Sequence, residues 1–79
     1  MNTIYQQTYD IISNFLQLEP GELKPDSHIV NDMGADSLAL VEIAFQLSEN
    51  FSIPMLDPDE NLYILSHLVE HIEKQIQDQ

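Results

Sequence analysis

The sequence predicts an all-α fold, an antiparallel bundle of three main helices with one additional short helix. Three long segments place their apolar residues at helical spacing, and no segment alternates apolar and polar residues as a half-buried strand would. Residues 1–79 are expected to form one small domain. A domain of this size buries only about 60% of the surface of its unfolded chain, so its core is small.

Helices are predicted at both ends of the chain. The first spans Thr3 to Leu16, and the last spans Leu62 to Ile76. In both segments apolar residues recur at steps of three and four, which places them on one face. These residues are Ile4, Ile11, Ile12 and Phe15 in the first helix, and Leu65, Leu68, Val69, Ile72 and Ile76 in the last.

A long polar loop, residues 17–33, is predicted to follow the first helix. Connections of this length without regular structure are uncommon, so we expect the loop to contain a short turn of helix and to pack across the bundle. A second short helix is expected in the acidic segment Asp57 to Glu60. Four apolar side chains of the long loop can enter the core: Leu18, Leu23, Ile29 and Val30.

The remaining helix, predicted from Asp36 to Asn50, has two apolar faces. At about 100° per residue, one arc matches the core face of the last helix. The other arc lies on a different side of the helix, beside Glu42 and Glu49. It either packs under the long loop or forms a partly exposed docking surface. The core arc comprises Leu40, Ile43, Ala44, Leu47 and Phe51, and the second comprises Leu38, Val41 and Phe45.

Ser37 begins this helix. Gly34 suits a tight turn into the helix, and Asp36 suits its N-cap. A phosphate attached to the Ser37 hydroxyl would lie near free backbone N–H groups and the positive end of the helix dipole. No His or Lys lies between His28 and His67, so no neighbouring base in the sequence can activate the hydroxyl.

Charge is the strongest feature of the composition. Fourteen acidic residues face only Lys24 and Lys74, which gives a formal net charge of −12. Nucleic acid and anionic membrane surfaces would be repelled, whereas basic protein surfaces would be attracted. The same charge favours a monomer. The chain has no cysteine and no apolar run long enough to span a membrane, so a cytoplasmic location is expected.

The segment around Ser37 resembles the acyl carrier protein family. The resemblance rests on Gly34-Ala35-Asp36-Ser37-Leu38 and continues through Val41-Glu42 and residues 49–54. It extends over the whole chain as a first helix, a long loop, the Asp-Ser-Leu helix, a short acidic helix and a last helix.

The resemblance implies that Ser37 receives 4′-phosphopantetheine from coenzyme A through a phosphopantetheinyl transferase, with Asp36 beside it. Acyl groups would then be carried as thioesters to synthases, acyltransferases or ligases that have basic docking surfaces. Those enzymes would dock on Leu38, Val41, Glu42, Phe45 and Glu49, and the core arc would line a cavity for the acyl chain. Fatty-acid, specialised lipid and polyketide biosynthesis all remain open.

Other functions fit the sequence less well. An enzyme is disfavoured because Ser37 has no visible base and the domain is small for a substrate cleft. No metal site is expected: the calcium-loop opening at Asp57 fails where Leu68 replaces the required Glu, and His67 and His71 lack a third ligand. The alternative from another class is an acidic helical adaptor that binds a basic protein partner and carries no prosthetic group.

Overall fold

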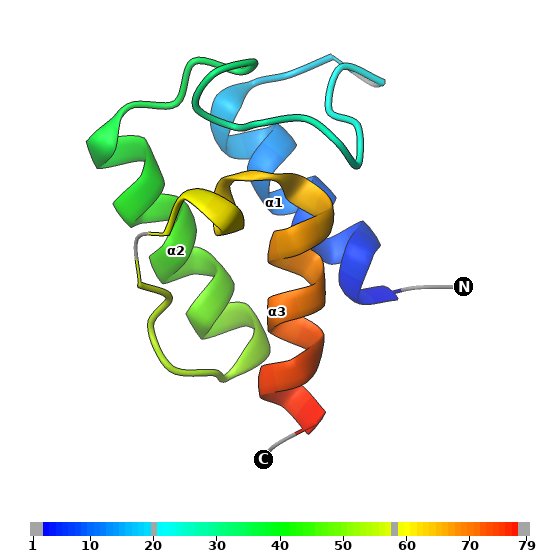
Figure 1. Ribbon diagram of the computed structural model, residues 1–79, viewed down its shortest axis with the longest axis vertical. Helices are drawn as coiled ribbons and strands as arrows, with labels where there is room; N and C mark the ends of the chain where they lie inside the picture. Colours follow the sequence, from blue (N-terminus) through cyan, green and yellow to red (C-terminus); the bar gives the residue numbers. More distant parts are fainter. Residues whose placement is uncertain (1–2, 20, 58, 78–79) are drawn as a thin grey trace.

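The computed structural model describes residues 3–19, 21–57 and 59–77. In these ranges the helices are α1 (Thr3–Leu16), α2 (Ser37–Phe51), the short 3₁₀ helix η1 (Glu60–Tyr63) and α3 (Leu65–Gln77) (Figure 1). No strand occurs among the described residues, although His28 and Ile64 form an isolated antiparallel bridge. The predicted all-α bundle of three main helices and one short helix is therefore confirmed.

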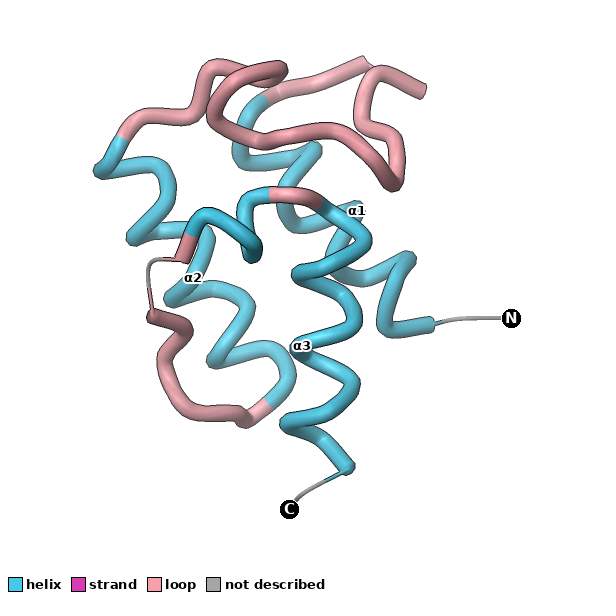
Figure 2. The backbone as a smooth tube through the Cα atoms, viewed as in Figure 1, coloured by secondary structure: helices cyan, strands magenta, loops and turns pink. Residues whose placement is uncertain are grey.

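The three long helices pack with α1 against both of the others. Figure 1 shows α1 running opposite to α2 and α3, which both begin at the end of the bundle where α1 finishes. Helix α1 contacts α2 and α3, and η1 contacts α3. The long loop lies across that same end of the bundle (Figure 2). No helix in the described ranges is long and apolar enough to cross a membrane.

The core takes side chains from every long helix and from both connecting loops. Of the stripe predicted on α3, Leu65, Leu68, Val69 and Ile72 are buried, whereas Ile76 is only half-buried against the core. From the long loop, Leu23 and Ile29 are buried, whereas Leu18 and Val30 are half-buried. The other buried hydrophobic residues are Ile12, Ala35, Ile43, Leu47, Ile53 and Leu56.

The expected turn of helix in the long loop is not found. Its described part, residues 17–19 and 21–36, contains turns but no helix; isolated bonds between residues four apart run from Asp32 N to His28 O (2.7 Å) and from Gly34 N to Val30 O (3.0 Å). The backbone of this loop is instead paired with the segment before α3. The Ile29 N–H donates to the Tyr63 carbonyl at 2.8 Å. Backbone groups that are satisfied by a distant segment do not need a local helix.

The boundaries predicted for the short helix and the last helix are wrong by a few residues. Helix η1 lies at Glu60–Tyr63 rather than 57–60, because the Asp59 side chain caps it by accepting from the Asn61 N–H at 2.9 Å. Helix α3 begins at Leu65 rather than Leu62, since Ile64 is extended (φ −94°, ψ 127°) and separates the two helices.

Carbonyl groups of the long loop take the place of a side-chain cap at the start of α3. The Leu65 N–H donates to the Ser27 carbonyl at 3.1 Å, and the Ser66 N–H donates to the Pro25 carbonyl at 2.8 Å. The first N–H groups of a helix have no partner within the helix, so each of these bonds satisfies a free donor. The start of α3 is thus set by contacts that span almost 40 residues of sequence.

Candidate functional site

Ser37 is the first residue of α2, and its side chain is exposed. Asp36 is the N-cap, as predicted: its backbone is extended, and its Oδ1 accepts from the Ala39 N–H at 2.8 Å. The helix then continues to Phe51 and ends at Ser52, which is left-handed (φ 56°). Within the described part of the chain, no side chain is hydrogen-bonded to the Ser37 hydroxyl.

The chain that leads into Ser37 is held by the long loop. Gly34 has a φ of +77°, a left-handed conformation that favours glycine. The next residue, Ala35, is buried, and its N–H donates to the Ile29 carbonyl at 2.9 Å. Ile29 is itself buried and is bonded through its own N–H to Tyr63. Ser37 is therefore positioned by Ala35, two residues before it, and, through Ile29, by η1.

A cavity of about 520 Å³ begins beside Ser37 and extends into the bundle. Its walls are formed by α2 on one side, and by residues 55–57, η1 and the first turns of α3 on the other. The lining is predominantly apolar, and the volume is typical of a site for a small organic ligand. The lining residues include Leu40, Ile43, Ala44, Leu47, Met55, Leu56, Leu62 and Leu68.

The core arc predicted for α2 faces this cavity with one exception. Ile43 and Leu47 are buried at its inner side, whereas Leu40 and Ala44 line it and are only half-buried. Phe51 packs against the core without lining the cavity. One face of α2 therefore serves both the core and the cavity wall.

The second apolar arc of α2 is exposed. Leu38 is 81% exposed, Val41 60% and Phe45 49%. These exposed fractions contradict the alternative that the three side chains are buried under the long loop. We refer to Leu38, Val41 and Phe45 as the exposed strip.

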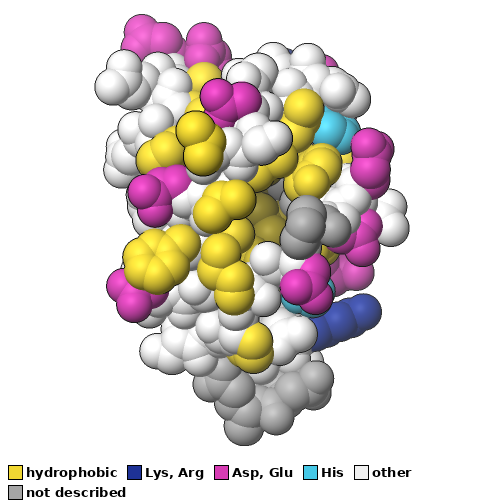
Figure 3. Space-filling model, turned by 90° about the vertical axis from the view of Figure 1, so that its left-hand side faces the viewer, with side chains coloured by type: hydrophobic (Ala, Val, Ile, Leu, Met, Phe, Trp, Pro, Cys, Tyr) yellow, Lys and Arg dark blue, Asp and Glu magenta, His cyan; other side chains and the backbone are white. Residues whose placement is uncertain are grey.

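The exposed strip has acidic neighbours and joins the mouth of the cavity. Glu42 and Glu49 are both exposed on α2. Val41 belongs to the strip and also lines the cavity. Figure 3 shows apolar side chains gathered on this face, with acidic side chains around them. A partner that binds the strip would thus touch a residue of the cavity wall.

Several cavity residues outside the core arc were not predicted from the sequence, among them Met55, Leu56, Leu62 and Tyr63. Met55 and Leu56 directly follow Ile53-Pro54, in a short apolar run beyond the end of α2. The other two lie in η1, whose position was misjudged. The apolar run Ile53 to Leu56 is the signal that could have indicated a wall formed by this loop.

The histidines and acidic residues form no obvious metal centre. No group of three or more His, Cys, Asp or Glu side chains in the described ranges is arranged to hold a metal ion. His67 and His71 lie one turn apart on α3, and the Nδ1 atom of His67 is 3.2 Å from the Asn61 carbonyl oxygen. This contact gives His67 a local structural partner.

Comparison with known proteins identifies a family. Residues 6–60 match the family model described as "Phosphopantetheine attachment site". The chain is 34% identical over 77 residues to the acyl carrier protein of Amoebophilus asiaticus, covering 96% of each chain. It is 33% identical over 72 residues to that of Campylobacter curvus, covering 90% of this chain and 94% of the relative. It is also 47% identical over 57 residues to that of Prochlorococcus marinus, covering 72% of this chain and 69% of the relative.

Proposed function

Because the chain belongs to the acyl carrier protein family, we propose that it carries acyl groups as thioesters on a 4′-phosphopantetheine arm attached to Ser37. Members of this family are carriers rather than enzymes, and membership implies a covalently attached 4′-phosphopantetheine group. When attached, this group supplies the terminal thiol that forms the thioester. The observation that carries the assignment to Ser37 is an exposed hydroxyl in the first turn of α2, beside an apolar cavity.

The residues around Ser37 fit the attached group. The hydroxyl is exposed, so a transferase can reach it, and the start of α2 favours a negative charge. Asp36 accepts from Ala39 and so keeps this turn helical while the hydroxyl of Ser37 faces outward. The base that removes the hydroxyl proton is assigned to the transferase, in keeping with the missing hydrogen-bond partner.

The cavity is proposed to shelter the acyl chain. Its lining on α2 is the core arc, and its apolar walls would remove a hydrocarbon chain from water. Burial of apolar surface contributes about 25 cal/mol per Å². The carrier form with an acyl chain would therefore be more stable than the form without one. Ser37 at the mouth gives a tethered chain a direct route into the cavity.

The exposed strip, with Glu42 and Glu49, is proposed as the docking surface for partner enzymes. The partners are the phosphopantetheinyl transferase and acyl-synthases, acyltransferases or ligases. Apolar side chains at the centre of an interface supply most of its affinity, and charges at its rim mainly raise the association rate. A net charge of −12 requires that the partner surfaces be basic. We place this carrier in fatty-acid, specialised lipid or polyketide biosynthesis in the cytoplasm.

Mass spectrometry tests the central assignment. The protein is incubated with coenzyme A and a phosphopantetheinyl transferase of broad specificity, and the intact mass is measured. We expect one added phosphopantetheine on the unaltered chain and none on Ser37→Ala. Modification that persists in Ser37→Ala would move the site. No modification with several transferases would instead favour the acidic adaptor.

A further inference from the structure

A second cavity lies directly behind the wall of the first. It has a volume of about 280 Å³ and is bordered by the loop after α2, η1 and α3. Three residues line both cavities: Met55, Asp57 and Leu62. The two spaces are therefore separated by one layer of side chains.

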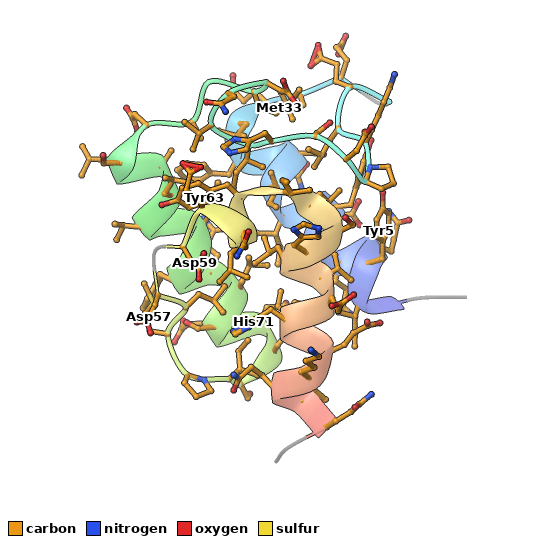
Figure 4. All side chains as sticks on the ribbon, in the orientation of Figure 1. Tyr5, Met33, Asp57, Asp59, Tyr63 and His71 are labelled. Atoms are coloured by element: carbon orange, nitrogen blue, oxygen red, sulfur yellow. The ribbon has the colours of Figure 1, made fainter. Side chains whose placement is uncertain are left out.

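The two cavities differ in chemistry. The first is lined mostly by aliphatic side chains, whereas the second is bordered by Asp57, Asp59, His71 and Gln75. Figure 4 shows Asp57, Asp59 and His71 in the same region, between the loop after α2 and the middle of α3. A hydrocarbon chain that entered this space would displace water from carboxylates without replacing their hydrogen bonds, which is unfavourable. Burial therefore stabilises a saturated chain only up to the layer of side chains that the two cavities share.

Met55 is the most adaptable part of that layer. Its side chain is 48% exposed, and its sulfur is 3.8 Å from the Ser48 hydroxyl, which is a weak contact. The backbone of residues 54–57 is not hydrogen-bonded to any other described residue. Leu62, in contrast, lies in η1, where its N–H donates to the Asp59 carbonyl at 2.8 Å. An unbranched thioether side chain adapts its shape at low cost, so the position of the wall depends on what occupies residue 55.

We propose that Met55 sets the upper limit on the length of the acyl chain that the first cavity shelters. This inference rests on the proposed function, because it assumes an acyl chain attached at Ser37. Met55 contacts Ser48, near the end of α2 opposite to Ser37, so a chain that ends before Met55 lies within the apolar lining, and each further carbon beyond that point stays outside it. Removal of the Met55 side chain would lengthen the apolar part of the first cavity by the volume of that side chain, and so make room for additional carbons before the polar groups of the second cavity are reached.

The experiment uses the full chain loaded from a series of saturated straight-chain acyl coenzyme A compounds, from hexanoyl to octadecanoyl. Mass spectrometry first verifies that each acyl-phosphopantetheine is attached. The melting temperature of each acyl form is then compared with that of the form carrying phosphopantetheine alone. Three variants are compared with the unaltered chain: Met55→Ala, Met55→Trp and, as the control, Phe15→Ala. Phe15 is a partly exposed hydrophobic residue on α1 that lines neither cavity.

In the unaltered chain the melting temperature should rise with chain length and then level off. Met55→Ala should move this levelling point to a longer chain by at least one member of the even-numbered series, and Met55→Trp should move it to a shorter one. Phe15→Ala should leave it in place. The inference is overturned if all four proteins level off at the same length, if Phe15→Ala moves the point equally, or if no stabilisation by chain length is seen. Failure of attachment itself would contradict the proposed function instead.

Discussion

Truncation of two neighbouring residues of α2 should separate its core face from its exposed strip. Leu47 is fully buried and lines the cavity, whereas Phe45, two residues earlier, is 49% exposed. We expect Leu47→Ala to lower the free energy of unfolding several-fold more than Phe45→Ala, although phenylalanine is the larger residue. The comparison is internally matched, because both changes shorten a side chain in the middle of the same helix to the best helix former.

The magnitudes follow from burial. Leu47→Ala removes three carbon atoms at about 0.8 kcal/mol each, and incomplete collapse of the site brings the total to about 3 kcal/mol. Full burial of a large apolar side chain is worth about 1.5–3 kcal/mol, so half-buried Phe45 contributes about 1 kcal/mol. A domain of this size is stable by roughly 4–12 kcal/mol. Leu47→Ala therefore removes a large share of the total stability, and Phe45→Ala a small one.

Urea denaturation monitored by circular dichroism measures both values, with thermal melting as a second readout. Each 1 kcal/mol corresponds to about 4–8 °C in a domain of 60–100 residues. If the slope of unfolding free energy against urea concentration is similar in both variants and in the unaltered chain, unfolding remains two-state in all three. If Phe45→Ala destabilised the fold as much as Leu47→Ala, the exposed strip would be part of the core, and the docking surface would have to lie elsewhere.

Three further predictions concern charge and an unpaired hydroxyl. Glu42→Lys and Glu49→Lys should slow phosphopantetheinylation mainly by raising the apparent KM, and the effect should shrink at high salt. Unchanged kinetics in both variants would show that these two residues are not part of the docking surface. Because salt screens the repulsion within a chain of net charge −12, the melting temperature should rise with NaCl, and more steeply per mole with MgCl2. A melting temperature that changes with neither salt would show that the charges are too dispersed to destabilise the fold. Thr8→Val should raise the free energy of unfolding by about 1 kcal/mol, because the Thr8 hydroxyl is fully buried with no hydrogen-bond partner in the described structure. The control is Thr8→Ala, which leaves a cavity and should therefore lower the free energy of unfolding.

Local signals in the sequence were sufficient for the long helices and for the start of α2. The spacing of Leu65, Leu68, Val69 and Ile72 identified the buried face of α3, and all four are buried. Asp36 before Ser37 identified a helix start, and the cap forms as expected. These features depend on interactions between residues three or four apart, so a continuous stretch of sequence contains all the information that they need.

Tertiary structure decided where α3 begins and how the cavity is bounded. Pro25 and Ser27 provide the carbonyls that accept from the first N–H groups of α3, and no pattern within α3 indicates partners so far away. Met55 and Leu62 become parts of one wall only because the loop after α2 folds back beside η1. Composition and helical spacing establish which residues are apolar and which helix faces they occupy. The pairing of distant segments determined which of those faces became core, cavity wall or exposed strip, because it alone sets what each face can contact.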